Sequence, residues 1–285
     1  MLQNSKDAIL DDFRQFCKET LGHKDIHTYS RYIRDFLEGY KGNLLNIREF
    51  DVRTFKANYS NFAPNTIANV VKSIRAFIKY LKTKTDDPQQ KYLLDEAVRY
   101  LKTPQIPVVP ADVPDKSELK RFNEVLVTDR EKAMFLVFAT SGLRKHELLS
   151  LTADDIDTET RIIRPKTRSS QTKHVWITLY GEEANEPLIR YIKSKNSWNG
   201  SKLFNDSLVR RTFDRVNSIT GLHLTPQRLR ESFCQMLKDA KVDRDYIDAF
   251  CGRIGSMSVQ GKHYTDLTAE NLKRVYDGAN IKVLS

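Results

Sequence analysis

The sequence predicts a mainly α-helical protein with a small β-sheet, an α+β fold, divided into two domains. Apolar residues recur at helical spacing through most of the first 100 positions, and a proline-rich segment follows them. The second half is again mostly helical in pattern but contains two short strand-like segments. With 285 residues, the chain is long enough for two domains of ordinary size, each with its own hydrophobic core.

The first domain, residues 1–103, is predicted to contain four or five helices. We expect helices over about 5–21, from about 28 to 40 and, with a weaker pattern, over 51–57. The clearest helix follows Pro64, because apolar residues at helical spacing form one continuous face: Ile67, Val70, Val71, Ile74, Phe77, Ile78 and Leu81.

The opposite face of that helix carries a basic stripe of four cations: Lys72, Arg75, Lys79 and Lys82. Such a stripe is most often a solvated surface. Here hardly any acidic residue interrupts it and the whole chain is basic. Contact with a DNA groove or with phosphates is therefore an equally open interpretation.

Residues 104–114 are predicted to be a linker between the domains. Four prolines occur within the twelve residues 103–114. Proline lacks the backbone donor that a helix needs and favours extended backbone. We therefore expect this segment to be extended rather than helical.

The second domain, residues 115–285, is predicted to begin with helices from 115 or 117 to 125 and over 130–139. Two short strands are expected at 161–164 and 174–179, joined by a polar, cationic loop. Further helices are expected over 188–194, 208–218, 226–240 and 268–279. The last one is amphipathic, and its apolar face docks either on its own domain or on a neighbouring protomer.

Residues 139–151 hold an arginine between two apolar segments. The apolar run that ends at Ala139 is followed by Gly142, which permits a sharp bend, and Arg144 then opens another helix. A guanidinium held in this way offers a rigid set of donors suited to a phosphate, at a helix start of the right polarity. The alternative is that Arg144 only caps the helix or pairs with Glu147.

The composition favours a polyanionic partner. Lys and Arg number 47 against 37 Asp and Glu, which gives a formal net charge of +10, and nucleic acid is the commonest partner of such a chain. The three cysteines lack the spacing of a disulfide framework or a zinc site. No apolar run is long enough to span a membrane, and aspartates occupy the N-terminus, so we expect a reduced, intracellular protein.

Further motifs follow Arg144 along the chain: Arg164-Pro165-Lys166-Thr167-Arg168, Gln227-Arg228-Leu229-Arg230, Gly252-Arg253 and Lys262-His263-Tyr264-Thr265. Together with Ser-Gly-Leu-Arg-x-x-Glu-Leu at 141–148, and in this order, they resemble the tyrosine recombinase (phage-type integrase) family. The resemblance covers most of the chain. It implies a two-domain clamp, with a helical core-binding (SAM-like) domain at 1–103 and an integrase-type catalytic domain at 115–285.

The resemblance also implies roles for individual residues. Tyr264 would attack a DNA phosphate and form a 3′-phosphotyrosine, while distant arginines would stabilise the charge on the pentavalent state: Arg144, Arg230 and Arg253. Lys166 is the expected general acid for the 5′ leaving oxygen and Lys173 its substitute, the alternative being a loop lysine without that role. Arg168 and Lys173 are expected DNA contacts. The phosphotyrosine stores the bond energy, so neither a nucleotide cofactor nor a metal is expected.

Two positions depart from the family pattern. Gln227 stands where the family commonly has histidine, and glutamine can donate a hydrogen bond but cannot shuttle a proton near neutral pH. Arg253 stands where histidine or tryptophan is usual, and it keeps a donor while adding charge. The identity of the base that accepts the tyrosine proton therefore stays open. His263, beside the tyrosine, is more consistent with a structural role.

The function that this resemblance implies is site-specific recombination or integration of double-stranded DNA. The enzyme would act as a homotetramer on DNA, through a Holliday junction, and could be a monomer when free. We expect a mobile element such as a virus or plasmid, in a prokaryotic host, as its setting. Two rival interpretations are a DNA-binding protein of this fold whose catalysis has decayed, and a type IB topoisomerase, against which the small N-terminal lobe argues.

Overall fold

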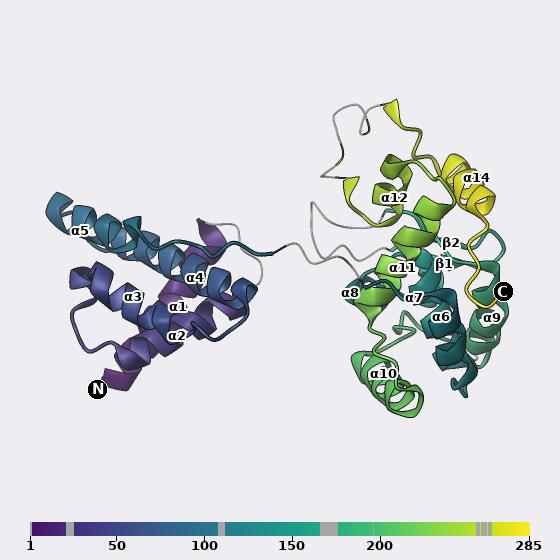
Figure 1. The fold of residues 1–285 in the computed structure, drawn as a ribbon, viewed down its shortest axis with the longest axis horizontal. Helices are drawn as coiled ribbons and strands as arrows, with labels where there is room; N and C mark the ends of the chain where they lie inside the picture. The colour runs from purple at the N-terminus through teal and green to yellow at the C-terminus, as the bar shows by residue number, and fades with distance from the viewer. Residues whose placement is uncertain are drawn as a thin grey trace. The chain divides into compact units, whose positions relative to one another are not determined.

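The computed structural model shows two compact units, Met1–Val109 and Pro110–Ser285 (Figure 1). It describes residues 2–20, 26–107, 112–165, 176–195, 197–254, 257, 261 and 264–285, with side chains from residue 6 onward. The division between the units falls within the segment 104–114, which is expected to be a linker. Each unit has a hydrophobic core of its own.

The first unit is helical. Its elements are α1 (Leu2–Glu19), α2 (His27–Gly39), the short 3-10 turn η1 (Leu44–Asn46), α3 (Glu49–Ala57), α4 (Pro64–Lys82) and α5 (Pro88–Arg99). The apolar pattern of the sequence did not predict the bounds of helix α5. It begins at a local signal, because the Asp87 side chain accepts a hydrogen bond from the Gln89 amide at 2.9 Å and Pro88 occupies the first turn.

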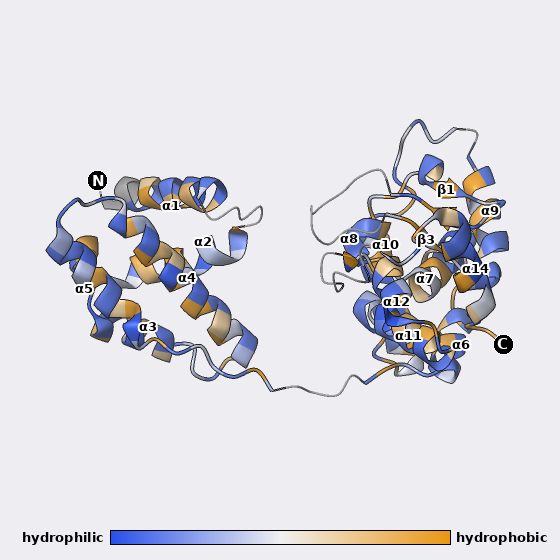
Figure 2. Ribbon diagram, turned by 90° about the horizontal axis from the view of Figure 1, so that it is seen from above, coloured by the Kyte–Doolittle hydropathy of each residue, from blue (hydrophilic) through white to orange (hydrophobic). Residues whose placement is uncertain are grey.

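Helix α4 forms the centre of this unit. Phe77, fully buried, packs edge-on against Phe13 with ring centroids 5.4 Å apart and stacks on Tyr80 at 5.7 Å. In Figure 2 the helices of both units carry orange and blue segments along the same ribbon, as amphipathic helices do.

The second unit is built around α7 (Asp129–Ser141), in which every residue from Ala133 to Ser141 is buried. Around it lie further helices and 3-10 turns: α6 (Lys116–Glu124), α8 (Lys145–Leu148), η2 (Ala153–Asp155), η3 (Glu182–Ala184), α9 (Asn185–Lys193), α10 (Asp206–Thr220), α11 (Pro226–Asp239), α12 (Arg244–Phe250) and α14 (Ala269–Ala279). Helices α9 and α11 both pack against α7.

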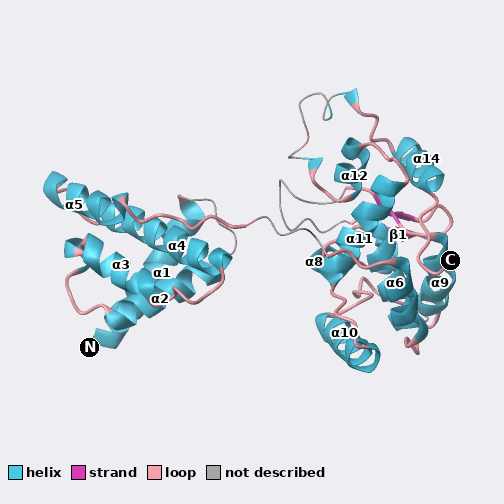
Figure 3. Ribbon diagram, in the orientation of Figure 1, coloured by secondary structure: helices cyan, strands magenta, loops and turns pink. Residues whose placement is uncertain are grey.

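A small antiparallel sheet completes this unit (magenta in Figure 3). Its strands are β1 (Ile156–Asp157), β2 (Ile162–Ile163) and β3 (Thr178–Leu179), in the order β1-β2-β3. Ile156 pairs with Ile163, and Ile162 with Leu179. The expected fold class, mainly α with a small sheet, is confirmed. Strand β1 was not expected, because two residues beside two aspartates give no alternating pattern.

The C-terminal helix α14 packs on its own unit, which is one of the two docking alternatives expected for its apolar face. Leu272 and Tyr276 are buried in a cluster with Phe233 and Phe250. The chain then continues past the helix to Val283, which is also buried. The Glu183 carboxylate accepts hydrogen bonds from the Val283 amide at 2.6 Å and from the next amide at 3.0 Å.

None of the helices in the described part of the chain combines the length and the apolar character that a membrane crossing requires.

The packing of α4 leads to a stability prediction. Phe77→Ala removes a fully buried ring, so we expect the free energy of unfolding of the first unit to fall by about 3–5 kcal/mol. Hydrogen–deuterium exchange of α4 peptides measures this loss. Phe50→Ala, at a phenylalanine that is 76% exposed in the same unit, is the matched control and should change that free energy by less than about 0.5 kcal/mol. Equal effects of the two substitutions would contradict the assignment of this core.

Candidate active site

The turn after α7 places Arg144. Gly142 ends the helix in the left-handed conformation, with φ of 66°. A Cβ atom at this position would lie 2.6 Å from the ring of Phe233, so both the backbone angle and the space require glycine. Leu143 is fully buried and Arg144 becomes the N-cap of α8, which means that packing fixes where this arginine emerges.

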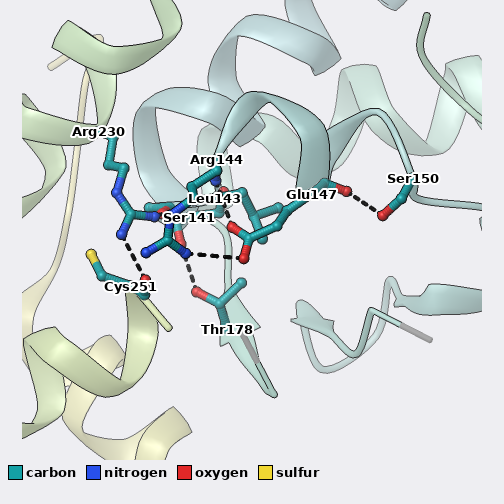
Figure 4. A network of polar contacts seen from close by, with 9 residues as sticks. Ser141, Leu143, Arg144, Glu147, Ser150, Thr178, Arg230 and Cys251 are labelled. Carbon is teal, nitrogen blue, oxygen red and sulfur yellow. Dashed lines mark hydrogen bonds and ion pairs between the residues drawn. The ribbon is translucent and has the colours of Figure 1, made fainter. Parts of the chain in front are cut away.

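Three consecutive carbonyl groups of this turn are held by side chains from three other elements, and Figure 4 shows the contact between Thr178 and Ser141. The Thr140 carbonyl accepts from the Tyr276 hydroxyl of α14 at 2.5 Å. The Ser141 carbonyl accepts from the Thr178 hydroxyl of β3 at 2.7 Å. The Gly142 carbonyl accepts from the guanidinium of Arg230 on α11. The turn is therefore positioned by the whole unit rather than by its own sequence.

Arg144 forms an ion pair with Glu147, which is one of the two roles expected for it from the sequence. Its Nη1 atom lies 3.1 Å from Glu147 Oε1, and its backbone amide donates to Oε2 at 2.7 Å. The Glu147 side chain is 4% exposed, whereas that of Arg144 is 23% exposed. The pair orients the arginine, and part of its side chain is still exposed, so the ion pair and phosphate binding are compatible.

Arg230 joins two distant segments of this unit. It is only 4% exposed, and besides the Gly142 carbonyl its guanidinium donates to the carbonyl of Cys251 at 2.6 Å. Burial, together with the nearby positive charges of Arg144 and Arg253, lowers the pKa of the Arg230 guanidinium. Figure 4 shows the side chains of Arg230 and Arg144 beside each other. Folding thus brings together residues that are 86 positions apart.

Arg253 follows α12 and enters the same neighbourhood. Its Nη1 atom lies 3.3 Å from Asp248 Oδ1, and its Nη2 atom lies 3.9 Å from the sulfur of Cys234. Gly252 before it has φ of 61°, which lets the chain turn there. We call Arg144, Arg230 and Arg253 the arginine cluster, because each of the outer two lies close enough to lower the pKa of the buried one.

A pocket of about 500 Å³ opens beside this cluster. Its charged lining is mostly cationic: Arg230, Lys238, Arg244 and Arg253 against Glu231 and Asp248. Gln227, exposed at the start of α11, also lines it and donates through Nε2 to Glu231 Oε1 at 2.9 Å. The pocket suits a small anion such as a phosphate group. Among the described residues, no group of three or more His, Cys, Asp and Glu could hold a metal ion.

The remaining predicted residues of the site lie elsewhere or are not described. Tyr264 is 83% exposed and is absent from the described lining of this pocket. Lys166, Arg168 and Lys173 lie outside the described residues, as does His263 beside the tyrosine. The structure therefore relates Gln227 and the arginine cluster to one another, and places Tyr264 on the surface of the same unit.

The basic stripe of α4 is divided into two kinds of residue. Arg75 donates to the Leu101 carbonyl at 2.7 Å, and Lys82 forms an ion pair with Asp95 at 2.6 Å. Both hold the end of the first unit against α4. Lys72 and Lys79 are exposed and have no partner among the described residues. This second pair is available to a ligand without first breaking a contact.

Sequence patterns missed the residues that support the turn. Thr178 and Tyr276 act through side-chain hydroxyls on backbone carbonyls that are 37 and 136 positions away in the chain. Such contacts follow from the packing of β3 and α14 on α7, and no motif in the sequence marks them.

Known proteins are similar to this chain in sequence and in fold. A model of the phage integrase family matches residues 114–271, more than half of the chain. Tyrosine recombinase XerA of Thermococcus kodakarensis is 26% identical over an alignment of 290 positions, which covers 96% of this chain and 95% of that protein. Tyrosine recombinase XerC of Myxococcus xanthus is 25% identical over an alignment of 309 positions, which covers 97% of this chain and 98% of that protein.

Two solved structures have a similar fold. XerH site-specific recombinase bound to palindromic difH substrate has a TM-score of 0.62 at 17% identity, over 87% of this chain and 78% of that one. The Tn1549 transposon integrase in complex with transposon right end DNA has a TM-score of 0.58 at 17% identity, over 93% of this chain and 97% of that one.

The support of the turn leads to a second stability prediction. Tyr276→Phe leaves the buried Thr140 carbonyl without its donor, so we expect the free energy of unfolding of the second unit to fall by about 1–3 kcal/mol. Urea denaturation followed by tryptophan fluorescence measures it, because both tryptophans lie in this unit. Tyr92→Phe, at an exposed tyrosine of the first unit, is the control. A Tyr276→Phe protein as stable as the control would show that the hydroxyl does not hold the turn.

Proposed function

This chain belongs to the phage integrase family of tyrosine recombinases, enzymes that break and rejoin DNA, and we propose that it is a site-specific recombinase with its phosphate site at the arginine cluster. The observation that carries the proposal is the buried guanidinium of Arg230, which ties the turn before Arg144 to the segment before Arg253. Arg230 and Arg253 thereby line one pocket, and Arg144 lies close to Arg230.

The proposed role of the cluster is to stabilise the charge that develops during phosphoryl transfer. The pentavalent state concentrates negative charge on the non-bridging oxygens, and fixed donors stabilise it without reorganising. Arg144 and Arg253 would contact those oxygens, with Arg230 between them. Gln227 would add a neutral donor by exchanging its hydrogen bond with Glu231 for one to the phosphate.

The proposed nucleophile is Tyr264. Its phenolic oxygen would attack phosphorus, form a 3′-phosphotyrosine and expel the 5′ oxygen, to which Lys166, or Lys173 in its place, would give a proton. The reverse attack by a 5′ hydroxyl rejoins the strand, so the bond energy is conserved without a nucleotide cofactor. Because Tyr264 lies exposed and away from the described lining of the pocket, we propose that DNA binding brings it to the phosphate, within its own protomer or a neighbouring one.

The proposed organisation is a clamp on double-stranded DNA. Residues 1–103 would form the core-binding domain, 104–114 the linker and 115–285 the catalytic domain, with Lys72 and Lys79 contacting phosphates. The net charge of +10 and the solved relatives that hold DNA substrates support this partner. We further propose that the enzyme acts as a DNA-bound homotetramer inside a prokaryotic cell, in the service of a mobile element such as a virus or plasmid.

Covalent trapping tests the chemistry. The protein is incubated with a nicked suicide duplex carrying the site that it selects from a random duplex library. We expect a covalent protein–DNA adduct that is absent in Tyr264→Phe, and cleavage reduced about 10²–10³-fold in Arg144→Ala, because one charge-stabilising donor is lost. Tyr92→Phe and Arg211→Ala, both at exposed positions outside the site, should cleave like the parent protein.

Each alternative has its own result in this experiment. Duplex binding without any adduct would indicate a DNA-binding protein that has lost catalysis. An adduct combined with relaxation of a supercoiled plasmid, but without strand exchange between two sites, would indicate a type IB topoisomerase. Full cleavage by Arg144→Ala would place the phosphate site elsewhere.

The salt dependence of DNA binding tests the basic stripe. Each phosphate contact contributes about 0.9 to the slope of log K against log salt, so the Lys72→Ala, Lys79→Ala double variant should lower that slope by about 2. Fluorescence anisotropy titrations at several salt concentrations measure it. Lys82→Ala, whose amine is paired with Asp95, should lower the slope less than either single variant. An unchanged slope in the double variant would identify the stripe as a solvated surface.

A further inference from the structure

Two of the three cysteines, 17 positions apart in the sequence, touch each other inside the second unit. The sulfur atoms of Cys234 on α11 and Cys251 after α12 are 3.3 Å apart, and both residues are buried free thiols. The third cysteine, Cys17, lies in the first unit and belongs to its core. The contact is therefore a local dithiol, formed by the packing of α11 against α12.

The dithiol lies at the pocket of the arginine cluster. Cys234 lines that pocket, so a small oxidant that enters it can reach this sulfur. Cys251 is fully buried and lies behind it. The carbonyl of Cys251 accepts the hydrogen bond from Arg230, and the sulfur of Cys234 is 3.9 Å from Arg253 Nη2. The backbone of Cys251 and the sulfur of Cys234 thus contact two of the three arginines directly.

The environment of the two thiols makes them unequal. The hydrogen bond with Cys251 is the main influence that lowers the pKa of the Cys234 thiol. The positive charges of Arg253 and Arg230 lower it further, and burial opposes them. The hydrogen bond with Cys234 and burial raise the pKa of the Cys251 thiol. Cys234, which also lines the pocket beside Arg253, is therefore the sulfur better placed to act as the nucleophile, and Cys251 lies fully buried next to it.

We propose that Cys234 and Cys251 form an oxidation site, at which a hydroperoxide converts the dithiol to a disulfide and thereby suppresses DNA cleavage at the arginine cluster. The disulfide half of this proposal is independent of the enzyme's activity, while the suppression half rests on the proposed function. Reversible disulfides inside cells are usually of this transient, sensing kind.

The chemistry balances with a hydroperoxide as the oxidant. The Cys234 thiolate attacks one oxygen of hydrogen peroxide, the O–O bond breaks, and a sulfenic acid and hydroxide form. The hydroxide takes up the proton that the Cys234 thiol released and becomes water. The Cys251 sulfur then attacks the Cys234 sulfur, and the S–S bond replaces the S–O bond. The thiol proton of Cys251 leaves with the departing oxygen as water. Two thiols and one peroxide thus become one disulfide and two waters, and a dithiol reductant reverses the change.

The disulfide requires the two sulfur atoms to move, and both cysteines lie in segments that position the arginines. The sulfur atoms must approach from 3.3 Å to about 2.05 Å. Cys251 carries one of the two carbonyls that hold Arg230. Its sulfur also lies close to Gly142, in the turn before Arg144, because a Cβ atom added to that glycine would be only 3.1 Å from it. Oxidation also removes the sulfur charge beside Arg253. A displacement of about 1 Å at such a site can cost on the order of 10²-fold in rate.

The first experiment tests the disulfide on the full chain without DNA. The protein is treated with hydrogen peroxide, the remaining thiols are blocked, and peptides are mapped by mass spectrometry. We expect a peptide pair linked through Cys234 and Cys251, with Cys17 recovered as a free thiol and the link abolished by dithiothreitol. Absence of that pair, or sulfinic acid on Cys234 without a link, would overturn the proposal.

The second experiment measures cleavage of the suicide duplex before and after peroxide treatment, as a ratio within each protein. We expect a fall on the order of 10²-fold for the parent protein and for Cys17→Ser, reversed by dithiothreitol. For Cys251→Ser, the ratio of cleavage after peroxide treatment to cleavage before it should stay near one. If Cys251→Ser does not fold, Cys234→Ala serves the same purpose. A linked but fully active protein would overturn the suppression, as would loss of activity that persists in both variants.

The two readouts also separate this proposal from the proposed function. A reduced parent protein that never cleaves DNA, yet forms the linked peptide pair, would contradict the proposed function and the suppression together while leaving the oxidation site standing.

Discussion

The buried guanidinium of Arg230 is the interaction on which the rest of the candidate site depends. A charge out of water is stable only when its donors are paired, and here the partners are backbone carbonyls at the ends of α7 and α12. The two carbonyls belong to segments that continue into Arg144 and Arg253. Removing or turning this one side chain would therefore change three cations at once.

Nearly buried carboxylates offset the repulsion among these cations. Glu147 pairs with Arg144 and Asp248 with Arg253, and both acids are largely shielded from solvent. Each pair holds one arginine in place while part of its side chain stays exposed, by 23% for Arg144 and 42% for Arg253. The site is thereby arranged before an anion arrives, which is the condition for efficient charge stabilisation. The same packing places Cys234 beside the cluster, so that the proposed oxidation and the proposed phosphate chemistry would share one set of contacts.

Much of the fold could be predicted from local patterns, because amphipathic helices carry their signal in residue spacing. The apolar face of α4 and the buried run of α7 are examples. Helix α5 and strand β1 escaped prediction for a common reason: each is stabilised mainly by what it packs or pairs with, and its own residues are too polar or too few to show a period. The residue spacing of helix α14 is recognisable in the sequence, but the surface on which the helix packs depends on the tertiary structure.

The sequence by itself determined the family, the helical character of both domains and the identity of the charged motifs, since these depend on residue type and order along the chain. Only the tertiary structure decided what those residues touch. It placed Arg230 between two carbonyls and brought Cys234 to Cys251. It also showed that two cations of the basic stripe, Arg75 and Lys82, contact their own unit. Contacts between residues far apart in sequence arise from the packing of whole elements, and spacing along the chain does not encode that geometry.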